Sequence, residues 1–219
     1  KIAAVALPLA LLFGADAIQY RLNDSGAEVV VTNRFGLSKL RDIRGGLPAL
    51  RHVILVGEAD EGVLSFDRLI ADHPPLAEQA ATGPDDPALM IYTSGTTGPP
   101  KGALHGHRVL AGHMPGIQFA HPDLGLPDDR MWTPADWAWA GGLLNCLLPA
   151  LLLGVPVVSS PGQKFDPEMA FRIMAEMGVR NAFIPPTALR LLRPVENPLE
   201  RHALKLRTIG SAGESLGRE

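Results

Sequence analysis

Short apolar runs alternate along this chain with longer segments whose apolar positions recur at the three- and four-residue spacing of a helix. The apolar runs predict buried strands at 28–32, 52–56, 88–91, 131–133, 155–159, 181–184 and 206–209. The longer segments predict helices at 16–22, 36–44, 65–72, 139–153, 167–177 and 187–192, with a broken helix at 108–121. Because strands and helices alternate, the pattern predicts an α/β fold of largely parallel sheets flanked by helices.

One proline-rich segment interrupts this alternation. Residues 74–87 contain four prolines and one glycine, and they carry no periodic apolar pattern. We interpret them as a linker between a first α/β segment at 1–73 and a second at 88–219. A chain of 219 residues is long enough for one or two such units with a substantial core.

Composition narrows the functional classes. With 46% hydrophobic and 20% charged residues, the chain resembles an ordinary soluble globular protein. A net charge of −3 and a pI near 6.2, without a basic tract, argue against nucleic acid as a partner. The single cysteine, Cys146, cannot form an internal disulfide, which favours a reducing, cytoplasmic location. Its apolar surroundings at 143–153 predict a buried, inert thiol.

Two apolar segments invite a membrane interpretation. Residues 2–13 follow one basic residue and precede an Ala-Asp-Ala tripeptide, which mimics a secretory signal and its cleavage site. Because the sequence has no initiator methionine and passes directly into a predicted helix, we favour interior sequence of a folded domain. The second segment, 143–160, is interrupted by prolines and a glycine and is too short to span a bilayer, so we expect no membrane span.

The candidate chemistry is concentrated in one loop, which follows the strand predicted at 88–91. Hydroxyl side chains, glycines and one lysine occur together there: Thr93, Ser94, Gly95, Thr96, Thr97, Gly98, Lys101 and Gly102. Glycines let backbone amides approach a ligand closely, while hydroxyls, amides and a lysine bind anionic oxygens. This combination predicts a loop that binds polyphosphate.

Other interpretations of this loop fit less well. A Walker A loop requires a glycine before the lysine and a serine or threonine after it, but Pro100 and Gly102 stand there. A solvated linker has a similar composition, and Lys101 by itself would be an ordinary surface lysine. The buried strand before the loop and the two prolines before the lysine favour phosphate binding. The histidines at 105, 107, 113 and 121 have no cysteine or carboxylate partner at ligand spacing, so we expect no metal site within these residues.

Three segments carry a resemblance to a known family. Residues 92–102 resemble the signature phosphate loop of the adenylate-forming, AMP-binding superfamily, which includes acyl-CoA synthetases, aryl-CoA ligases, luciferases and peptide-synthetase adenylation domains. The continuation at 103–108 is also typical of acyl-CoA synthetases. Residues 133–142 are similar to the acyl-pocket stretch of short- and medium-chain synthetases, and residues 208–216 resemble the adenine-binding turn.

The resemblance implies an AMP-forming acid–thiol ligase with a role in fatty acid metabolism. In such an enzyme a carboxylate attacks the α-phosphate of ATP, pyrophosphate leaves, and coenzyme A then displaces AMP from the acyl-adenylate. ATP, Mg²⁺, coenzyme A and a small carboxylate are therefore the implied cofactors and substrates. The residues implied to bind the ATP phosphates are Thr93, Ser94, Gly95, Thr96, Thr97, Gly98 and Lys101. Of these, Lys101 and Thr96 are the expected catalytic residues.

The resemblance also assigns an adenine-binding turn and an acyl pocket. The residues expected against the adenine are Gly213, Glu214 and Ser215, the last at a position where family members often carry proline. The residues expected to bound the acyl group are Trp139, Ala140 and Gly141, although a tryptophan there is also an ordinary core residue. Small side chains at 140 and 141 leave volume for an acid longer than acetate, each buried methylene contributing about 0.8 kcal/mol.

The resemblance further implies a fragment of the family's large N-terminal domain. The acidic motif for Mg²⁺, the ribose-binding aspartate and the C-terminal domain with its catalytic lysine would all follow residue 219. Residues 1–219 alone are therefore expected to be inactive. An adenylation domain that loads a carrier-protein thiol and a non-catalytic nucleotide-binding module remain alternatives. The sequence leaves open which acid is activated and whether the protein forms a homo-oligomer.

Overall fold

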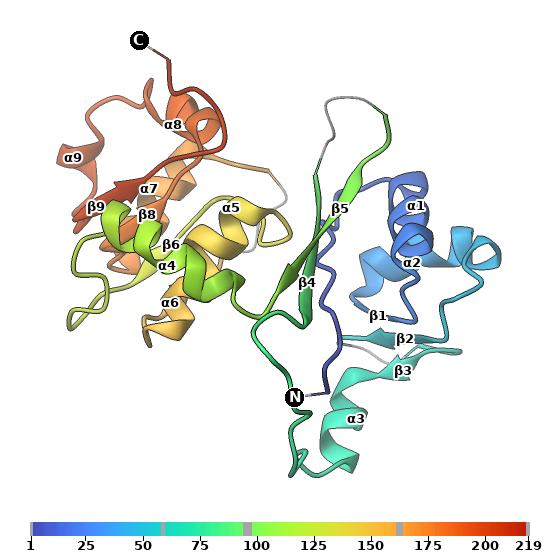
Figure 1. The fold of residues 1–219 in the computed structure, drawn as a ribbon. Helices are drawn as coiled ribbons and strands as arrows, with labels where there is room; N and C mark the ends of the chain where they lie inside the picture. The colour runs from blue at the N-terminus through green and yellow to red at the C-terminus, as the bar shows by residue number, and fades with distance from the viewer. Residues whose placement is uncertain (1, 58–59, 94–97, 161–163, 218–219) are drawn as a thin grey trace. The chain divides into compact units, whose positions relative to one another are not determined.

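The computed structural model describes residues 2–57, 60–93, 98–160 and 164–217. The chain forms two compact units, Lys1–His107 and Arg108–Glu219. Each unit combines strands with helices, which confirms the predicted α/β class (Figure 1). Within the described ranges, no helix combines the length and the apolar character needed to cross a bilayer.

The first unit contains a parallel sheet in the order β1-β2-β3. Its elements up to the third helix are α1 (Ala15–Ser25), β1 (Val29–Thr32), α2 (Arg34–Ile43), the 3₁₀ turn η1 (Arg44–Gly46), β2 (His52–Leu55), β3 (Leu64–Ser65) and α3 (Phe66–Asp72). The two predicted strands and three predicted helices of this region are confirmed, whereas the short strand β3 was not expected. Residues 73–86 form no helix or strand. The linker at 74–87 stays a prediction about domain organisation.

Local sequence explains how these helices begin and end. Helix α1 ends at Gly26, which adopts the left-handed conformation at φ 63°. Helix α2 begins after Asn33, whose side chain accepts a hydrogen bond from the Gly36 amide at 3.0 Å. The apolar faces of the two helices then meet in one core with partly buried residues of β1 and β2: Ile18, Leu22, Leu40, Ile43, Val30 and Val53.

A β-hairpin follows in the same unit. Strands β4 (Pro87–Thr93) and β5 (Lys101–Gly106) pair antiparallel, with Thr93 opposite Lys101 and Tyr92 opposite Gly102. The strand β4 confirms the prediction at 88–91, but the sequence pattern did not predict β5 or an antiparallel pair. A parallel pair needs a crossover of a dozen or more residues, whereas the connection from Thr93 to Lys101 is short enough only for a hairpin.

The second unit contains a four-stranded parallel sheet in the order β7-β6-β8-β9. Its elements are α4 (Val109–Ala120), β6 (Met131–Trp132), α5 (Ala140–Gly142), the π-helical turn η2 (Leu143–Leu147), α6 (Leu148–Leu152), β7 (Val157–Val158), α7 (Pro167–Glu176), β8 (Asn181–Phe183), α8 (Pro186–Leu192), α9 (Pro198–Arg201) and β9 (Thr208–Gly210). The four predicted strands of this region are all present. The short helix α9 was not predicted.

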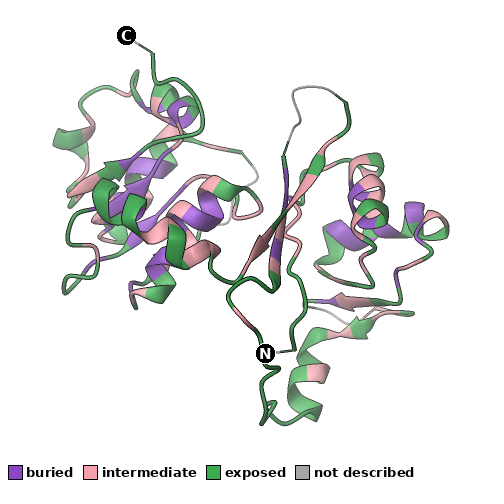
Figure 2. Ribbon diagram, viewed as in Figure 1, coloured by how far each residue is buried: buried purple, intermediate pink, exposed green. Residues whose placement is uncertain are grey.

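Successive strand residues of this sheet face two different cores, as the two-residue period of a strand requires. Trp132 and Ala182 pack against α7 and α8, while the neighbouring Met131 and Phe183 pack against the segment that carries Cys146. Figure 2 shows buried residues concentrated on these central strands. Cys146 is buried, as predicted. Burial raises the pKa of its thiol to about 12, which disfavours the reactive thiolate.

Two helix predictions need correction. The helix expected over 139–153 is divided into α5, η2 and α6. Pro149 has no backbone amide to donate an α-helical hydrogen bond, and the turn before it, η2, is π-helical. The broken helix expected over 108–121 is continuous instead, because α4 runs through Pro115 without interruption. One proline removes a single backbone donor, and the remaining hydrogen bonds keep this helix intact.

Candidate functional site

The hairpin β4–β5 holds the ends of the predicted phosphate loop. Thr93 and Lys101 face each other across the two strands, and both are exposed. Gly98 is also exposed and has φ 86°, a conformation in which glycine is favoured. The other predicted phosphate-binding residues, Ser94, Gly95, Thr96 and Thr97, lie outside the described residues. The structure thus brings the lysine and one hydroxyl to the same end of the hairpin.

The predicted adenine-binding turn follows β9 directly. Gly213 has φ 104°, and the turn is exposed. The Glu214 carboxylate accepts hydrogen bonds from the backbone amide of Thr187 at 3.1 Å, from the Thr187 hydroxyl, and from Arg190 Nη2 at 2.9 Å. Arg190 Nη1 also donates to the carbonyl of Ser215 at 3.2 Å. The turn is therefore tied to the start of α8.

These contacts change the electrostatics of Glu214. The Thr187 hydroxyl and the Arg190 guanidinium both favour the ionised carboxylate, so they hold the pKa of Glu214 below its ordinary value. The side chain of Glu214 thus stays charged at neutral pH and acts as a tie between the turn and α8. If this turn binds adenine, it does so through its backbone, because the Glu214 side chain is bound to Thr187 and Arg190. The adenine-binding role of Gly213, Glu214 and Ser215 stays a prediction.

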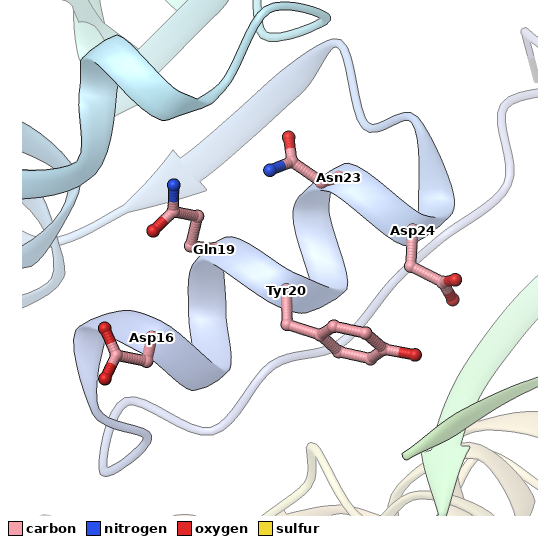
Figure 3. A pocket seen from close by; sticks show the side chains of 5 residues that line it. All are labelled: Asp16, Gln19, Tyr20, Asn23 and Asp24. Carbon is pink, nitrogen blue, oxygen red and sulfur yellow. The ribbon is translucent and has the colours of Figure 1, made fainter. Parts of the chain in front are cut away.

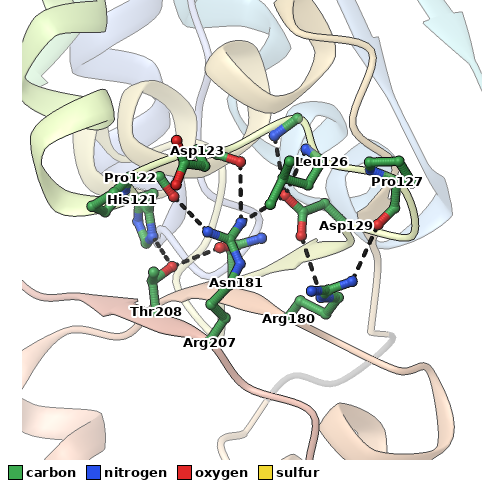
Figure 4. Close-up of polar contacts among 11 residues, drawn as sticks. His121, Pro122, Asp123, Leu126, Pro127, Asp129, Arg180, Asn181, Arg207 and Thr208 are labelled. Carbon is green, nitrogen blue, oxygen red and sulfur yellow. Dashed lines mark hydrogen bonds and ion pairs between the residues drawn. The ribbon is translucent and has the colours of Figure 1, made fainter.

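A buried polar chain fixes the strand that leads into this turn (Figure 4). The Thr208 hydroxyl donates to Asn181 Oδ1 at 2.6 Å, and His121 Nδ1 lies 2.6 Å from the same hydroxyl oxygen. Because that hydroxyl already donates to Asn181, it accepts from His121 when His121 carries its proton on Nδ1. This chain connects α4, β8 and β9, which are far apart in the sequence.

An ionic cluster stands beside that polar chain. Asp129 is 3% exposed and accepts hydrogen bonds from the amides of Gly125 and Leu126, both at 3.1 Å. Arg207 lies 2.8 Å from one Asp129 oxygen, and Arg180 lies 3.5 Å from the other. The carboxylate therefore joins the loop at 122–129 to the residues that immediately precede β8 and β9, so it helps to position both strands.

His121 makes the stability of this region depend on pH. Burial lowers the pKa of His121 below its ordinary 6.5, and the nearby Arg207 charge lowers it further. The unfolded chain therefore binds this proton more readily than the folded chain, so stability is lost as the pH falls below 6.5 toward the lowered folded-state pKa. We expect the free energy of unfolding in urea to fall from pH 7 to pH 5, and His121→Gln to flatten that dependence. An equally steep dependence in His121→Gln would contradict this assignment.

The predicted acyl-pocket residues lie at the start of α5. Trp139 precedes this helix and is 44% exposed, and Ala140 is exposed beside it. Gly141 faces the sheet, because a Cβ placed there would lie 3.0 Å from the ring of Phe183 on β8. Gly142 is closely packed, since its Cβ would lie 2.6 Å from the Asp136 carbonyl oxygen. The lack of side chains at 141 and 142 thus has a packing reason.

Sequence reasoning missed residues that contact the predicted sites. Thr187 and Arg190 bind Glu214, and Phe183 faces Gly141. No local pattern marks these residues, because the contacts of Glu214 span 24 and 27 positions. Among the described residues, no group of three or more His, Cys, Asp or Glu side chains is arranged to hold a metal ion.

Comparisons with known proteins extend over the whole chain. A family model described as AMP-binding enzyme matches residues 1–219. Acetyl-coenzyme A synthetase of Bacillus subtilis (strain 168) is 32% identical over 100% of this chain and 38% of its own length. Benzoate–CoA ligase of Thauera aromatica is 32% identical over 90% of this chain and 37% of its own length. The chain spans less than two fifths of either relative.

Solved structures agree with the sequence relatives. Brucella canis acyl-CoA synthetase aligns with a TM-score of 0.83 and 32% identity over 98% of this chain and 39% of its own. The anthranilate CoA ligase AuaEII, solved in complex with anthranoyl-AMP, aligns with a TM-score of 0.84 and 27% identity over 97% of this chain and 41% of its own. These likenesses confirm the predicted acyl-CoA synthetase-like fold, of which the chain covers a part.

Proposed function

Because this chain belongs to the family of AMP-binding enzymes, the adenylate-forming superfamily, we propose that the whole protein is an AMP-forming acid–thiol ligase. It activates a carboxylate with ATP and transfers the acyl group to coenzyme A. The observation that carries this proposal is the family match over residues 1–219, together with relatives that are named as CoA synthetases or ligases. The single cysteine supports a reducing compartment, and we place the protein in the cytoplasm.

The proposed reaction has two steps. A carboxylate oxygen attacks the α-phosphorus of ATP, the bond to the bridging oxygen breaks, and pyrophosphate leaves. The thiolate sulfur of coenzyme A then attacks the acyl carbon, and AMP leaves with the electrons of the broken carbon–oxygen bond. Both steps need the reactants in line and donors that meet the developing negative charge.

Each proposed site residue has a role in the first step. Lys101, at the start of β5, places a positive charge at the end of the hairpin, where the departing pyrophosphate would be bound. The hydroxyls and amides of the loop that it follows, Thr96 among them, would surround the phosphates. The exposed backbone around Gly213 would lie against the adenine ring, and the tie from Glu214 to Arg190 would keep that backbone in position.

Mg²⁺ belongs to the proposed reaction as a partner of the ATP phosphates, whose charge it neutralises. Within the part of the chain that the structure describes, no cluster of acidic or imidazole side chains could hold the ion by itself. We therefore assign no residue of this chain to the metal. Residues 1–219 cover only 38% of a relative such as the Bacillus subtilis synthetase. We accordingly propose that they do not catalyse the reaction alone.

The proposed substrate is a short- to medium-chain or aryl carboxylate. The relatives do not separate these classes, because an acetyl-coenzyme A synthetase and a benzoate–CoA ligase are both 32% identical to this chain. The proposal rests on the small side chains at Ala140 and Gly141 beside the exposed Trp139. The small, exposed Ala140 leaves space beside Trp139 for methylene or ring carbons, whereas the position of Gly141 is packed against Phe183.

Gly141→Trp in the whole protein is expected to shift the preferred acid toward acetate or propionate. Because a Cβ at residue 141 would already lie 3.0 Å from the Phe183 ring, the indole can be placed only by displacing that ring or by filling the proposed acyl site beside it. A specificity constant measured for acids of increasing chain length tests this, with Gly141→Ala as the smaller step. An unchanged optimum in both variants would show that residue 141 does not bound the acyl site.

Carboxylate-dependent exchange of labelled pyrophosphate into ATP tests the proposed function directly. Exchange by the whole protein, followed by thioester formation when coenzyme A is added, is the expected result. Adenylate formation with transfer only to a carrier-protein thiol would change the assigned acceptor. Nucleotide binding without exchange for any short-chain, medium-chain or aryl acid would overturn the proposal.

A further inference from the structure

Helix α1 contacts both ends of the segment that joins β4 to β5. At one end, the Tyr92 hydroxyl donates to Asp24 Oδ2 at 2.6 Å and lies 3.4 Å from the Arg21 carbonyl oxygen. At the other end, the Tyr20 hydroxyl donates to the Pro100 carbonyl oxygen at 3.0 Å. Tyr92 is the last residue but one of β4, and Pro100 immediately precedes β5. One helix therefore holds the two ends of this segment.

Spacing along the helix explains how one face reaches both ends. Tyr20 and Asp24 stand four residues apart, so their side chains lie on the same side of α1. Figure 3 shows both pointing to the same side of the helix, among the polar side chains that line a pocket along it. The two hydrogen bonds span 80 and 68 positions of the sequence, so they are tertiary contacts rather than part of the hairpin itself.

Ring packing strengthens the same contact. The rings of Tyr20 and Tyr92 meet edge to face, with centroids 6.4 Å apart and an interplanar angle of 79°. The Arg21 guanidinium lies 5.5 Å from the centroid of the Tyr92 ring. The Tyr92 ring also lies across Gly102, where a Cβ would be 3.2 Å from Tyr92 Cζ. Tyr92 is 5% exposed, whereas Asp24 is exposed, so the bond between them is shielded from water on the tyrosine side only.

The Tyr92 hydroxyl stays a donor at neutral pH. Burial raises the pKa of Tyr92 above its ordinary value of 10.0, and the hydrogen bond to Asp24 raises it further. The bond to a carboxylate is charge-assisted and therefore stronger than a neutral one.

We propose that Tyr20 and Asp24 are positioning residues for the phosphate-binding loop, and that they set the affinity for the β- and γ-phosphates of ATP and for pyrophosphate. This inference rests on the proposed function. Holding the backbone at Tyr92 and Pro100 places the neighbouring Thr93 and Lys101 before a ligand binds. Such preorganisation reduces the cost of binding, and binding is tighter as a result.

The test compares Tyr20→Phe, Asp24→Asn and the double variant with Asp16→Asn in the whole protein. Asp16→Asn is the matched control, because it makes the same charge change on the same helix in a residue without a role in the proposed contact. In the pyrophosphate-exchange assay we expect Tyr20→Phe, which removes one hydrogen bond, to raise the KM for ATP and for pyrophosphate about two- to tenfold. Asp24→Asn keeps an acceptor for Tyr92 and loses only the charge, so a smaller rise is expected. The affinity for AMP, which lacks these phosphates, should stay unchanged.

Four results distinguish the positioning role of Tyr20 and Asp24 from the proposed function on which it rests. An inactive wild-type protein would overturn the proposed function. An active wild type whose Tyr20→Phe and Asp24→Asn variants keep both KM values would overturn only the positioning role. Weaker AMP binding together with a lowered Tm would also overturn it, because a general loss of structure affects every ligand. A Tm within a few degrees of wild type, with KM raised for phosphates alone, supports it.

Discussion

Replacing Lys101 with alanine in the whole protein is expected to slow adenylate formation by about 10²–10³-fold, the usual loss when one preorganised charge-stabilising group is removed. Lys101 stands opposite Thr93 at the end of the β4–β5 hairpin, where we propose that the departing phosphates are bound. The affinity for AMP should therefore remain nearly unchanged. Single-turnover formation of acyl-adenylate, measured beside AMP binding, gives both quantities.

Two further variants test whether the loss of rate comes from the charge at residue 101. Lys101→Arg keeps the charge but changes its geometry, so a partial recovery of the rate is expected. Lys205→Ala removes an exposed lysine outside the hairpin and should leave the rate at the wild-type level. If Lys101→Ala weakened ATP and AMP binding equally, the lysine would not act on the departing phosphates.

Replacing Asp129 with alanine is expected to reduce the free energy of unfolding by about 3 kcal/mol, because it breaks a buried ion pair and leaves its partners without compensation. The carboxylate contacts Arg207 and Arg180 and accepts hydrogen bonds from two backbone amides. The two amides lose their side-chain acceptor, and the two arginines lose their charged partner while keeping backbone carbonyl acceptors at Pro122, Asp123 and Pro127. Urea unfolding measured at constant pH gives the change directly.

The matched control is an exposed ion pair of the same unit. Glu168→Ala removes the contact between Glu168 and Arg201 at 2.6 Å, but both side chains are about half exposed, so only a small change is expected. Asp129→Asn keeps an acceptor for the amides and loses only the charge, and an intermediate loss is expected. A loss in Asp129→Ala no larger than that in Glu168→Ala would show that the buried cluster does not stabilise the fold.

The sequence predicted most elements and their order, although it placed the start of α2 at residue 36 instead of at Arg34. Local signals nevertheless set several helix ends. Gly26 ends α1 in a left-handed turn, and Asn33 caps α2 through a hydrogen bond three residues away. Helix α7 begins at Pro167, and the Asp166 side chain accepts from the Met169 amide at 3.0 Å. Each of these signals acts within one turn of backbone, so composition and spacing reveal it.

The loop chemistry was also apparent in the sequence, but its support was not. A run of glycines, hydroxyls and one lysine after an apolar strand indicates phosphate binding without any knowledge of the fold. The sequence does not show that Lys101 begins a second strand, because that strand, β5, is defined by its hydrogen bonds to β4. The alternating pattern of a half-exposed hairpin strand is weak in this sequence, so β5 was missed.

The sequence by itself determined the α/β class, most helices and strands and the resemblance to a family, and it predicted the residues of a phosphate loop. Only the tertiary structure decided which residues support them: Asp24 for Tyr92, Arg190 for Glu214, and His121 and Asn181 for Thr208. Apolar periodicity shows which face of an element is buried, but not what lies against it. Partners 24 to 87 positions apart are chosen by packing of the whole unit, and no local pattern records that choice.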